Sequence, residues 1–399
     1  MKFAFYTNCI SPHQLPLADE IIKLLGAENY SYIYTELLSN ERRKLGWNDA
    51  LIADWCRQGD DSSVELQSAD ILLSEHRSIK LFERRATNGK ITIYCSERWF
   101  KPVVGILRLL SFSYFRMAFR FVRLLSSDSN FYYYPMGIHA ARDMARLCGL
   151  LHGDWRCLFK APEIDFERRP GGCIWLRNKS TTTNKYCLDK MRMWGYFVNS
   201  SKLRVKSLVV EETLGDRGNG QNESSAQAPN KISVLWVGRL LKLKRVDTII
   251  HAVGECKKRR LVDVSLPMVT LDIYGVGPEE MRLKKMAIRY GEVIKFHPPV
   301  SIEEVRKLMS KHDLYVLSSN AHEGWGAVIS EALEEGMKVV GTYEAGASAT
   351  ILPKSLLFKA SDYKKLSSLL LGDIDVLGIG AWTASSAAKH IVNVFYKRD

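Results

Sequence analysis

The chain lacks the cysteine patterns of a protein held together by zinc or disulfides. Eight cysteines occur among its 399 residues, and no two of them form a C-x-x-C pair. Several lie within apolar, strand-like runs, as Cys95 does at the end of the segment 91–95. We therefore expect reduced, cytosolic thiols rather than a disulfide framework or a zinc site.

Other common signals are missing as well. Thr7 and Asn8 interrupt the hydrophobic N-terminus, so it does not have the apolar segment of a secretory signal. No metal motif such as D-x-D stands in a convincing place, and we expect neither a metal ion nor another cofactor. A dinucleotide-dependent dehydrogenase would carry G-x-G-x-x-G after its first strand, whereas the turn at Gly275 offers only two of these glycines.

The chain is basic, with a formal net charge of +13. No recognisable RNA-binding or DNA-binding motif accompanies this charge, so nucleic acid is not an expected partner. Residues 100–125 mix Leu, Phe and Tyr with no acid and with five cations: Lys101, Arg108, Arg116, Arg120 and Arg123. Such a segment suits a helix at an anionic membrane surface. It is not a spanning segment, because each central arginine would cost roughly 2.5–3.5 kcal/mol in hydrocarbon. The alternative is a helix that is buried on one face and solvated on the other.

The length predicts two domains, since the chain exceeds one ordinary core. From residue 232 onward, apolar runs alternate with longer amphipathic stretches, which is typical of a parallel, doubly wound α/β sheet. The predicted strands are 232–238, 269–274, 292–296, 313–317 and 337–341, preceded by less clear strands near 2–7, 30–34, 70–73 and 91–95. We place the domains at 1–205 and 231–380, with a polar, glycine-rich mobile loop at 206–230 and a helical segment at 381–399.

The most informative segment is Glu323-Gly-Trp-Gly-Ala-Val-Ile-Ser-Glu331. Gly324 and Gly326 allow a sharp backbone turn, and a helix is expected from about Ala327. The unpaired N–H groups of a helix's first turn, together with its dipole, can hold a diphosphate. Glu323 and Glu331 can accept paired hydrogen bonds, one from a sugar and the other from a ribose. The alternative is an ordinary strand–loop–helix unit with solvated glutamates.

Two turns upstream add cations and glycines. An apolar strand runs into Gly238 and delivers Arg239 and Lys244, where arginine can fork across two phosphate oxygens and lysine acts as a point charge. A second strand ends in Gly275-Val-Gly277-Pro278, with the proline placed to open a helix. Taken alone, the first could be a solvated basic loop and the second a tight turn between strand and helix.

Together these motifs resemble the C-terminal domain of glycosyltransferase family 4. The match covers roughly residues 231–355 and agrees in order and spacing. It rests on four elements: Gly238-Arg239-Leu…Lys244, Gly275-x-Gly277-Pro278, Ser318-Ser319…Glu323-Gly324-Trp325-Gly326…Glu331, and Gly336 with Ala345-Gly346. The first half is similar, more loosely, to bacterial surface-polysaccharide glycosyltransferases. The resemblance implies the GT-B architecture, in which two Rossmann-like domains face each other and a C-terminal helix crosses back to the first.

The resemblance also implies roles for the residues of these motifs. The implied donor-binding set is Gly238, Arg239, Lys244, Gly275, Gly277, Ser319, Glu323, Gly324, Trp325, Gly326, Ala327 and Glu331. Within it, Glu323 would bind donor-sugar hydroxyls and Glu331 the ribose. Arg239, Lys244 and the helix start at 325–328 would stabilise the leaving diphosphate in place of a metal ion. The transfer would retain the sugar's configuration, with the leaving phosphate taking the acceptor proton and no side chain acting as nucleophile.

In the first domain, the loops that follow the strands are where a ligand would bind. The segment Ser11-Pro12-His13-Gln14 lacks the glycines that family members carry there, which leaves His13 as the candidate polar group. Glu97 ends a predicted strand, where many relatives carry a histidine that approaches the donor sugar. His139 is a further candidate. The alternatives are a structural loop histidine at 13, a surface salt bridge between Glu97 and Arg98, and a packed helix-start histidine at 139.

The sequence therefore predicts a retaining glycosyltransferase that moves a sugar from a UDP-linked donor to a cell-surface glycan or a polyprenyl-linked acceptor. We expect it in the cytoplasm, peripheral at the inner face of the membrane. A competing enzyme is a nucleotide-sugar epimerase or hydrolase of the same fold, in which His13, Glu97 or Asp143 would act on water or on the sugar ring. A third alternative is an inactive scaffold at a membrane assembly. The identity of the sugar and the linkage depend on loop geometry that these motifs do not encode.

Overall fold

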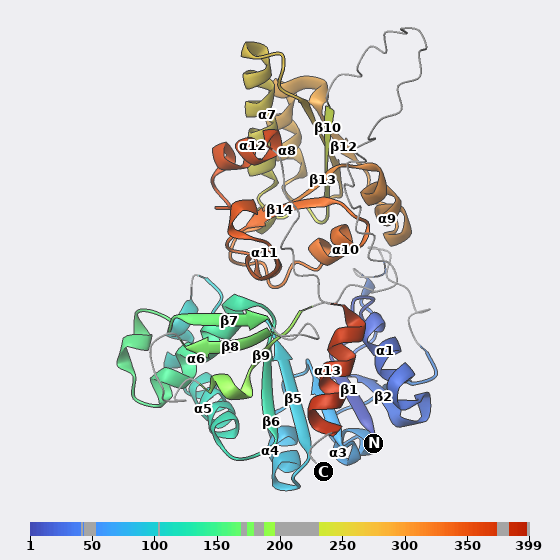
Figure 1. Cartoon of the computed structure of the whole chain (residues 1–399), viewed down its shortest axis with the longest axis vertical. Coiled ribbons are helices and arrows are strands. Elements are labelled where there is room, and N and C mark those ends of the chain that lie inside the picture. Colours follow the sequence, from blue (N-terminus) through green and yellow to red (C-terminus); the bar gives the residue numbers. More distant parts are fainter. Residues whose placement is uncertain are drawn as a thin grey trace, which may run out of the picture.

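The computed structural model describes residues 1–40, 43, 53–102, 104–168, 174–178, 187–195, 231–372 and 383–396. Within these ranges the chain forms two α/β domains, which lie one above the other in Figure 1. The predicted mobile loop at 206–230 lies outside the described residues. The predicted GT-B arrangement of two Rossmann-like domains is confirmed.

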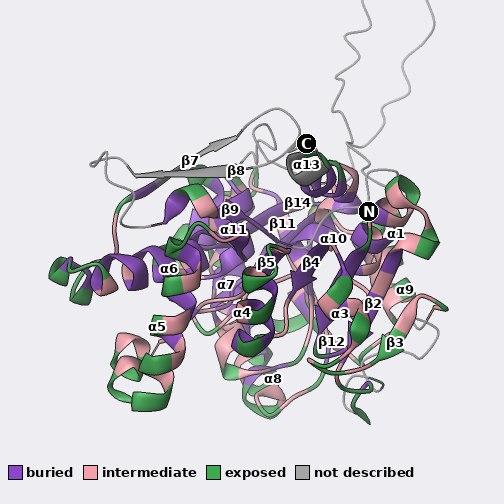
Figure 2. Ribbon diagram, turned by 90° about the horizontal axis from the view of Figure 1, so that it is seen from below, coloured by how far each residue is buried: buried purple, intermediate pink, exposed green. Residues whose placement is uncertain are grey.

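The first domain contains a six-stranded parallel sheet with the order β3-β2-β1-β4-β5-β6. Its strands are β1 (Phe3–Thr7), β2 (Tyr30–Tyr34), β3 (Cys56–Gln58), β4 (Ile71–Ser74), β5 (Ile91–Ser96) and β6 (Phe131–Pro135). All residues of β1, β4 and β6 are buried, as expected for parallel strands that are covered on both faces. Figure 2 shows this buried interior. The sequence predicted four of the six strands and missed β3 and β6.

Helices surround this sheet. They are α1 (Leu15–Leu25), α3 (Val64–Ser68), α4 (Ile79–Thr87), α5 (Phe112–Ser126) and α6 (Ile138–Leu151), with 3-10 turns η1 (Ala27–Asn29), η3 (Gly105–Leu110), η4 (Trp155–Leu158) and η5 (Leu188–Lys190). A small antiparallel sheet, also missed by the sequence, joins β7 (Ile164–Arg168), β8 (Ile174–Asn178) and β9 (Arg192–Met193). The basic segment 100–125 is thus η3 followed by most of α5.

The second domain repeats the same topology. Its sheet order is β12-β11-β10-β13-β14-β15, and every pairing is parallel. The strands are β10 (Lys231–Val237), β11 (Met268–Tyr274), β12 (Ile294–His297), β13 (Leu314–Leu317), β14 (Lys338–Thr342) and β15 (Leu357–Phe358). The helices are α7 (Val246–Val262), α8 (Glu280–Ala287), α9 (Ile302–Lys311), α10 (Val328–Glu334), α11 (Gly346–Ile351) and α12 (Tyr363–Leu371), with 3-10 turns η6 (Lys242–Lys244), η7 (Ile288–Val293) and η8 (Lys354–Leu356). Five of these strands were predicted within about two residues.

The last helix, α13 (Ala384–Tyr396), packs against α1 of the first domain, as the resemblance implied. Its buried side chains include Ala384, Ala388 and Ile391. Small alanine side chains allow the two helices to approach closely. The first domain is therefore completed by residues that follow the second domain in the chain.

The two domains meet at the start of α6. Gly137 precedes this helix with φ +85°, and a Cβ there would lie 3.0 Å from both Trp325 and Thr350. The Ile138 N–H donates to the Thr350 hydroxyl at 3.0 Å. His139 Nε2 lies 2.7 Å from the Tyr343 carbonyl oxygen, and burial lowers the pKa of His139 to about 4. His139 is therefore a neutral donor that joins the domains, in agreement with the structural alternative for this residue.

Candidate active site

A cavity of about 470 Å³ lies between the domains, beyond the carboxyl ends of strands from both sheets. This is where open α/β sheets bind ligands. The predicted residues that line it are Gly238, Arg239, Lys244, Gly275, Glu323, Trp325, Gly326, Ala327 and Glu331 from the second domain, and His13 and Glu97 from the first. Gly277, Ser319 and Gly324 lie outside its lining, although each is close to it in sequence. The candidates for a part in the reaction therefore all line one cavity: Arg239, Lys244, Glu323, His13 and Glu97.

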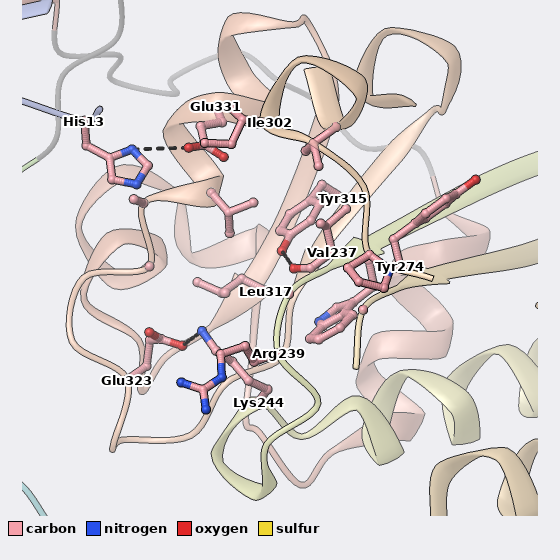
Figure 3. A pocket seen from close by; sticks show the side chains of 18 of the residues that line it. His13, Val237, Arg239, Lys244, Tyr274, Ile302, Tyr315, Leu317, Glu323 and Glu331 are labelled. Atoms are coloured by element: carbon pink, nitrogen blue, oxygen red, sulfur yellow. Dashed lines mark hydrogen bonds and ion pairs between the residues drawn. The ribbon is translucent and has the colours of Figure 1, made fainter. Parts of the chain in front are cut away.

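Lys244 and Glu323 form an ion pair within this cavity. Lys244 Nζ lies 2.6 Å from Glu323 Oε2, and both side chains are largely buried (Figure 3). The loop that carries Lys244 is fixed from behind, because the Ser318 hydroxyl donates to the Lys244 carbonyl oxygen at 2.6 Å. The Asn320 N–H donates to the Leu243 carbonyl oxygen at 2.8 Å. When a ligand phosphate reaches Lys244, the lysine would thus exchange the Glu323 carboxylate for the phosphate as its anionic partner.

The loop with Glu323 is held by the start of α11. The Gly346 N–H donates to the Gly324 carbonyl oxygen at 3.1 Å, and the Ala347 N–H donates to the Trp325 carbonyl oxygen at 2.8 Å. A Cβ at Gly346 would lie 2.7 Å from the Gly324 oxygen, so only glycine allows this approach. The predicted Ala345-Gly346 element therefore acts by fixing the loop. α10 itself is short, at seven residues.

His13 of the first domain pairs with Glu331 of α10. Its Nδ1 lies 3.2 Å from Glu331 Oε1 (Figure 3). Burial lowers the pKa of His13, while the charge of Glu331 opposes that shift. A neutral His13 with its proton on Nδ1 donates to the carboxylate. The carboxylate that the resemblance assigns to the ribose is thus in contact with the opposite domain.

Glu97 reaches across the domain boundary. Its Oε1 accepts the Trp325 N–H at 3.2 Å, and its Oε2 pairs with Lys101 at 3.2 Å. A Cβ at Gly324 would lie 1.8 Å from the Glu97 carboxylate, so the glycine makes room for this contact. The alternative partner considered for Glu97, Arg98, instead contacts Asp143 at 3.3 Å.

Asp143 is a structural carboxylate. Besides Arg98, it accepts the Phe100 N–H at 3.0 Å, and it is buried. Burial raises its pKa, with Arg98 opposing the shift. Since these contacts occupy both oxygens and Asp143 is not part of the cavity wall, its proposed part in an epimerase or hydrolase has no support in this geometry.

The glycine turns shape the loop that carries Arg239. A Cβ at Gly275 would lie 1.9 Å from the Gly238 carbonyl oxygen, and one at Gly277 would lie 2.5 Å from that of Leu240. The loops after β10 and β11 are joined by a hydrogen bond from the Leu240 N–H to the Val276 carbonyl oxygen at 2.9 Å. Gly275 and Gly277 therefore position Arg239 by letting two backbones touch, rather than by forming a cradle of their own.

The sequence reasoning missed the apolar wall of the cavity. It consists of residues from three strands, from the loop before α9 and from α9 itself: Trp236, Val237, Tyr274, Pro299, Val300, Ile302, Val305, Tyr315 and Leu317. In Figure 3 the labelled charged residues lie along one side, while Ile302, Tyr315 and Tyr274 lie along the other. An available signal was Trp236 near the carboxyl end of β10, directly before the predicted phosphate loop. The cavity thus has a charged half and a half suited to a flat, apolar ring face.

Glu75 was also missed. It follows β4 as Glu97 follows β5, so the same rule would have selected it. It accepts a hydrogen bond from the Gln14 amide, which in turn accepts one from the Tyr32 hydroxyl. Burial raises the pKa of Glu75 to about 7, and the nearby Glu97 charge acts in the same direction. Glu75 is therefore a partly buried carboxyl whose protonated form is favoured in the folded chain.

Comparison with known proteins agrees with these features. Residues 220–371 match the family model of glycosyl transferases group 1. The GtfA subunit of a UDP-N-acetylglucosamine–peptide N-acetylglucosaminyltransferase from Streptococcus pneumoniae is 28% identical over 117 residues, which are 29% of this chain and 22% of that protein. The uncharacterised glycosyltransferase MJ1069 from Methanocaldococcus jannaschii is 27% identical over 161 residues, 39% of each chain. The chain thus matches well under half of the length of these relatives.

Solved structures match over the whole chain. The lipopolysaccharide outer core galactosyltransferase WaaB aligns with a TM-score of 0.59 at 12% identity and covers 100% of both chains. HepE from Anabaena, solved with UDP, aligns with a TM-score of 0.53 at 15% identity and covers 99% of this chain and 96% of its own. At such identities the likeness concerns the fold, which is that of the GT-B glycosyltransferases.

Proposed function

We propose that this protein is a retaining glycosyltransferase that uses a UDP-linked sugar. The observation that carries the proposal is the convergence of Arg239, Lys244, Glu323 and Glu331 on one interdomain cavity with an apolar far half. This set combines cations for a diphosphate with carboxylates for hydroxyl groups, and an aromatic wall for a base. The match to group 1 glycosyl transferases over the second domain supports it.

The roles follow from position. Arg239 and Lys244 would stabilise the departing diphosphate as its charge develops, as preorganised cations do in a cavity with little water. When a phosphate takes Lys244, Glu323 is released from its 2.6 Å pair and becomes an acceptor for sugar hydroxyls. Glu331 would accept the ribose hydroxyls. No side chain is proposed as a nucleophile, and the leaving phosphate would take the acceptor proton.

The acceptor would be a cell-surface glycan or a polyprenyl-linked glycan, bound by the first domain at the cytoplasmic face of the membrane. In support, solved relatives of the same fold include a lipopolysaccharide galactosyltransferase. Among the described residues, no helix is long and apolar enough to cross a bilayer. We propose peripheral contact through residues 100–125. We also propose that transfer needs no metal ion, so excess EDTA should leave the rate unchanged.

A thermal-shift screen tests the proposal first. At about 100 times its dissociation constant, a ligand that binds only the folded protein stabilises it by roughly 2.7 kcal/mol. UDP or a UDP-sugar should raise the melting temperature, and NAD should not. Incubation with a panel of UDP-sugars and a lipid-linked acceptor should then give a product of retained anomeric configuration by NMR. Release of free sugar without an acceptor, at a rate equal to transfer, would instead indicate a hydrolase.

A further inference from the structure

The first domain exposes an unusual number of large apolar side chains in two segments. The first segment is η3 with α5, and it exposes Val104, Leu107, Leu110, Phe112, Phe115 and Phe119. The second segment is η4 with the residue after it, and it exposes Trp155, Leu158 and Phe159. Contiguous exposed apolar surface on a soluble domain usually marks an interaction site.

α5 divides its side chains sharply between two faces. Ala118, Phe121 and Leu125 are buried in the domain core. Phe112 is 76% exposed, and Phe115 and Phe119 lie on the same outer face, with their rings stacked 6.5 Å apart. The helix therefore does pack on one face, as the structural alternative held, but its other face is aromatic rather than merely solvated.

The second segment is held rigidly with its aromatic rings outward. Arg146 of α6 donates to the carbonyl oxygens of Cys157 and Leu158. Trp155 is 68% exposed and Phe159 is 89% exposed. Because the backbone of this turn is already anchored to α6, little backbone freedom has to be lost when these rings enter an apolar phase.

Both segments pack against α6, which contacts α5 and η4. A hollow between α5 and the end of α6 is lined by Phe119 and Arg123 of α5 and by Leu151 and His152. Ser126 Oγ lies 3.2 Å from His152 Nε2, which joins the two helix ends. η4 begins three residues after His152, so the second segment directly follows the end of α6.

The charge on these two segments selects the kind of partner. Arg108, Arg116 and Arg123 are exposed within the first segment, which contains no acid from residue 100 to residue 125. Arg120 is instead paired with Glu83, so it contributes less than the sequence suggested. The cations of the second segment are also engaged, since Arg156 pairs with Asp154 and Lys160 with Glu163. Exposed aromatic rings beside arginines fit the interface of an anionic bilayer.

We propose that the first domain docks on an anionic bilayer through both segments, with Trp155 and Phe159 inserting beside α5. The choice of a lipid-linked acceptor rests on the proposed function, but the docking itself does not. The second segment extends the contact beyond residues 100–125 and places the end of α6 at the membrane. Because α6 begins at the domain boundary beside Trp325, the bilayer contact and the donor cavity lie at opposite ends of one helix.

The test is vesicle flotation without nucleotide, comparing pure phosphatidylcholine with phosphatidylcholine containing phosphatidylglycerol. The wild type should prefer the anionic vesicles, and the preference should fade with salt as the screening length shortens. The double variant Trp155→Ser/Phe159→Ser should lose at least about tenfold in affinity, since two large apolar side chains stay in water. Arg116→Gln/Arg123→Gln should lose roughly fivefold per arginine on anionic vesicles only.

The chain offers a matched control in the second domain. At the end of α7, Leu261 is 77% exposed and Val262 is 91% exposed, directly after the cations of 257–260. Leu261→Ser/Val262→Ser should bind vesicles like the wild type. A loss in this control with none in the Trp155/Phe159 variant would move the membrane face to α7 and overturn the proposal.

Tryptophan fluorescence gives a second readout. Lipids with brominated acyl chains quench a ring that enters the bilayer, and the difference between wild type and Trp155→Phe isolates this ring from the other eight tryptophans. Quenching that disappears in Trp155→Phe supports insertion.

Equal vesicle binding by Trp155→Ser/Phe159→Ser and wild type would show that the second segment is not part of the membrane contact. Sedimentation as a dimer that this variant abolishes, without vesicle binding, would assign the surface to a second copy of the chain. Each variant should keep its UDP-induced thermal shift. A failed transferase assay would not change the conclusion drawn from vesicle binding.

Discussion

The two domains have the same strand order, yet their carboxyl edges carry different chemistry. In the second domain, the loops after β10, β11 and β13 bring cations, glycines and carboxylates to one cavity. In the first domain, the loops after β1 and β5 bring His13 and Glu97, which contact Glu331 and Trp325 of the second domain rather than forming a separate site. The shared topology therefore brings loops of both sheets to the cavity, whereas the loop residues decide which side chains each domain contributes to its wall.

The largest expected effect tests the second domain's part of this comparison. Arg239→Ala and Lys244→Ala should each weaken UDP binding or turnover by about 2–5 kcal/mol, the range for truncating one member of a desolvated charged pair. Lys242→Ala, an exposed cation of the same turn, is the control and should bind UDP normally. Calorimetric titration with UDP measures all three. If neither Arg239→Ala nor Lys244→Ala changes UDP affinity, the cations are not a phosphate clamp.

The next effect separates the two carboxylates. Glu331→Gln should weaken binding of free UDP by about 1.5–3 kcal/mol, the range for a hydrogen bond to a charged group. Glu323→Gln should leave the affinity for free UDP nearly unchanged and mainly lower the transfer rate, because Glu323 pairs with Lys244 and is not assigned to the ribose. UDP titration and initial rates distinguish the two. An equal loss of UDP affinity in both variants would contradict this division of roles.

A third test addresses the closing surface of the first domain. A Cβ at Gly195 would lie 2.3 Å from the Trp325 ring, and one at Gly254 would lie 2.2 Å from the Tyr290 ring inside the second domain. Overpacking of this kind costs about 1–3 kcal/mol. Gly195→Ala should therefore impair domain closure and turnover with little loss of thermal stability, whereas Gly254→Ala should lower the melting temperature. Matching losses of stability would show that Gly195 supports the fold and not the closure.

The smallest effect concerns Glu75. Its folded pKa of about 7 lies above the usual glutamate pKa of 4.5, so the folded state favours the protonated carboxyl. Stability from this group is complete below about pH 4.5 and is lost as pH rises through 7. Glu75→Gln should therefore stabilise the protein at pH 8 by about 1–2 kcal/mol, less than the full shift would give because the side chain is only partly buried. Urea unfolding at pH 8 and pH 4 measures this, and a gain at pH 4 alone would reverse the argument.

The sequence was informative where a residue's role depends on its own loop. The sequence predicted that Arg239, Lys244, Glu323 and Glu331 share one site because cations, glycines and carboxylates follow strands at fixed spacing, and all four line the cavity. It was uninformative where a role depends on another part of the chain. Gly324 makes room for Glu97, which lies 227 positions earlier, and no local pattern encodes that contact. The fully buried β6 was missed for a related reason: Phe131-Tyr-Tyr-Tyr-Pro135 lacks the alternation of a half-exposed strand.

The return of α13 to α1 affects how the protein is made. During synthesis, α1 leaves the ribosome long before α13, with the whole second domain translated in between. At about 5–20 residues per second, the surface of α1 that α13 covers would stay open for tens of seconds. The second domain can finish folding in that interval, whereas the first cannot until its closing helix has emerged. A translation stop between α12 and α13 would therefore release a chain with one finished domain and one exposed apolar seam, a direct substrate for chaperones and proteases.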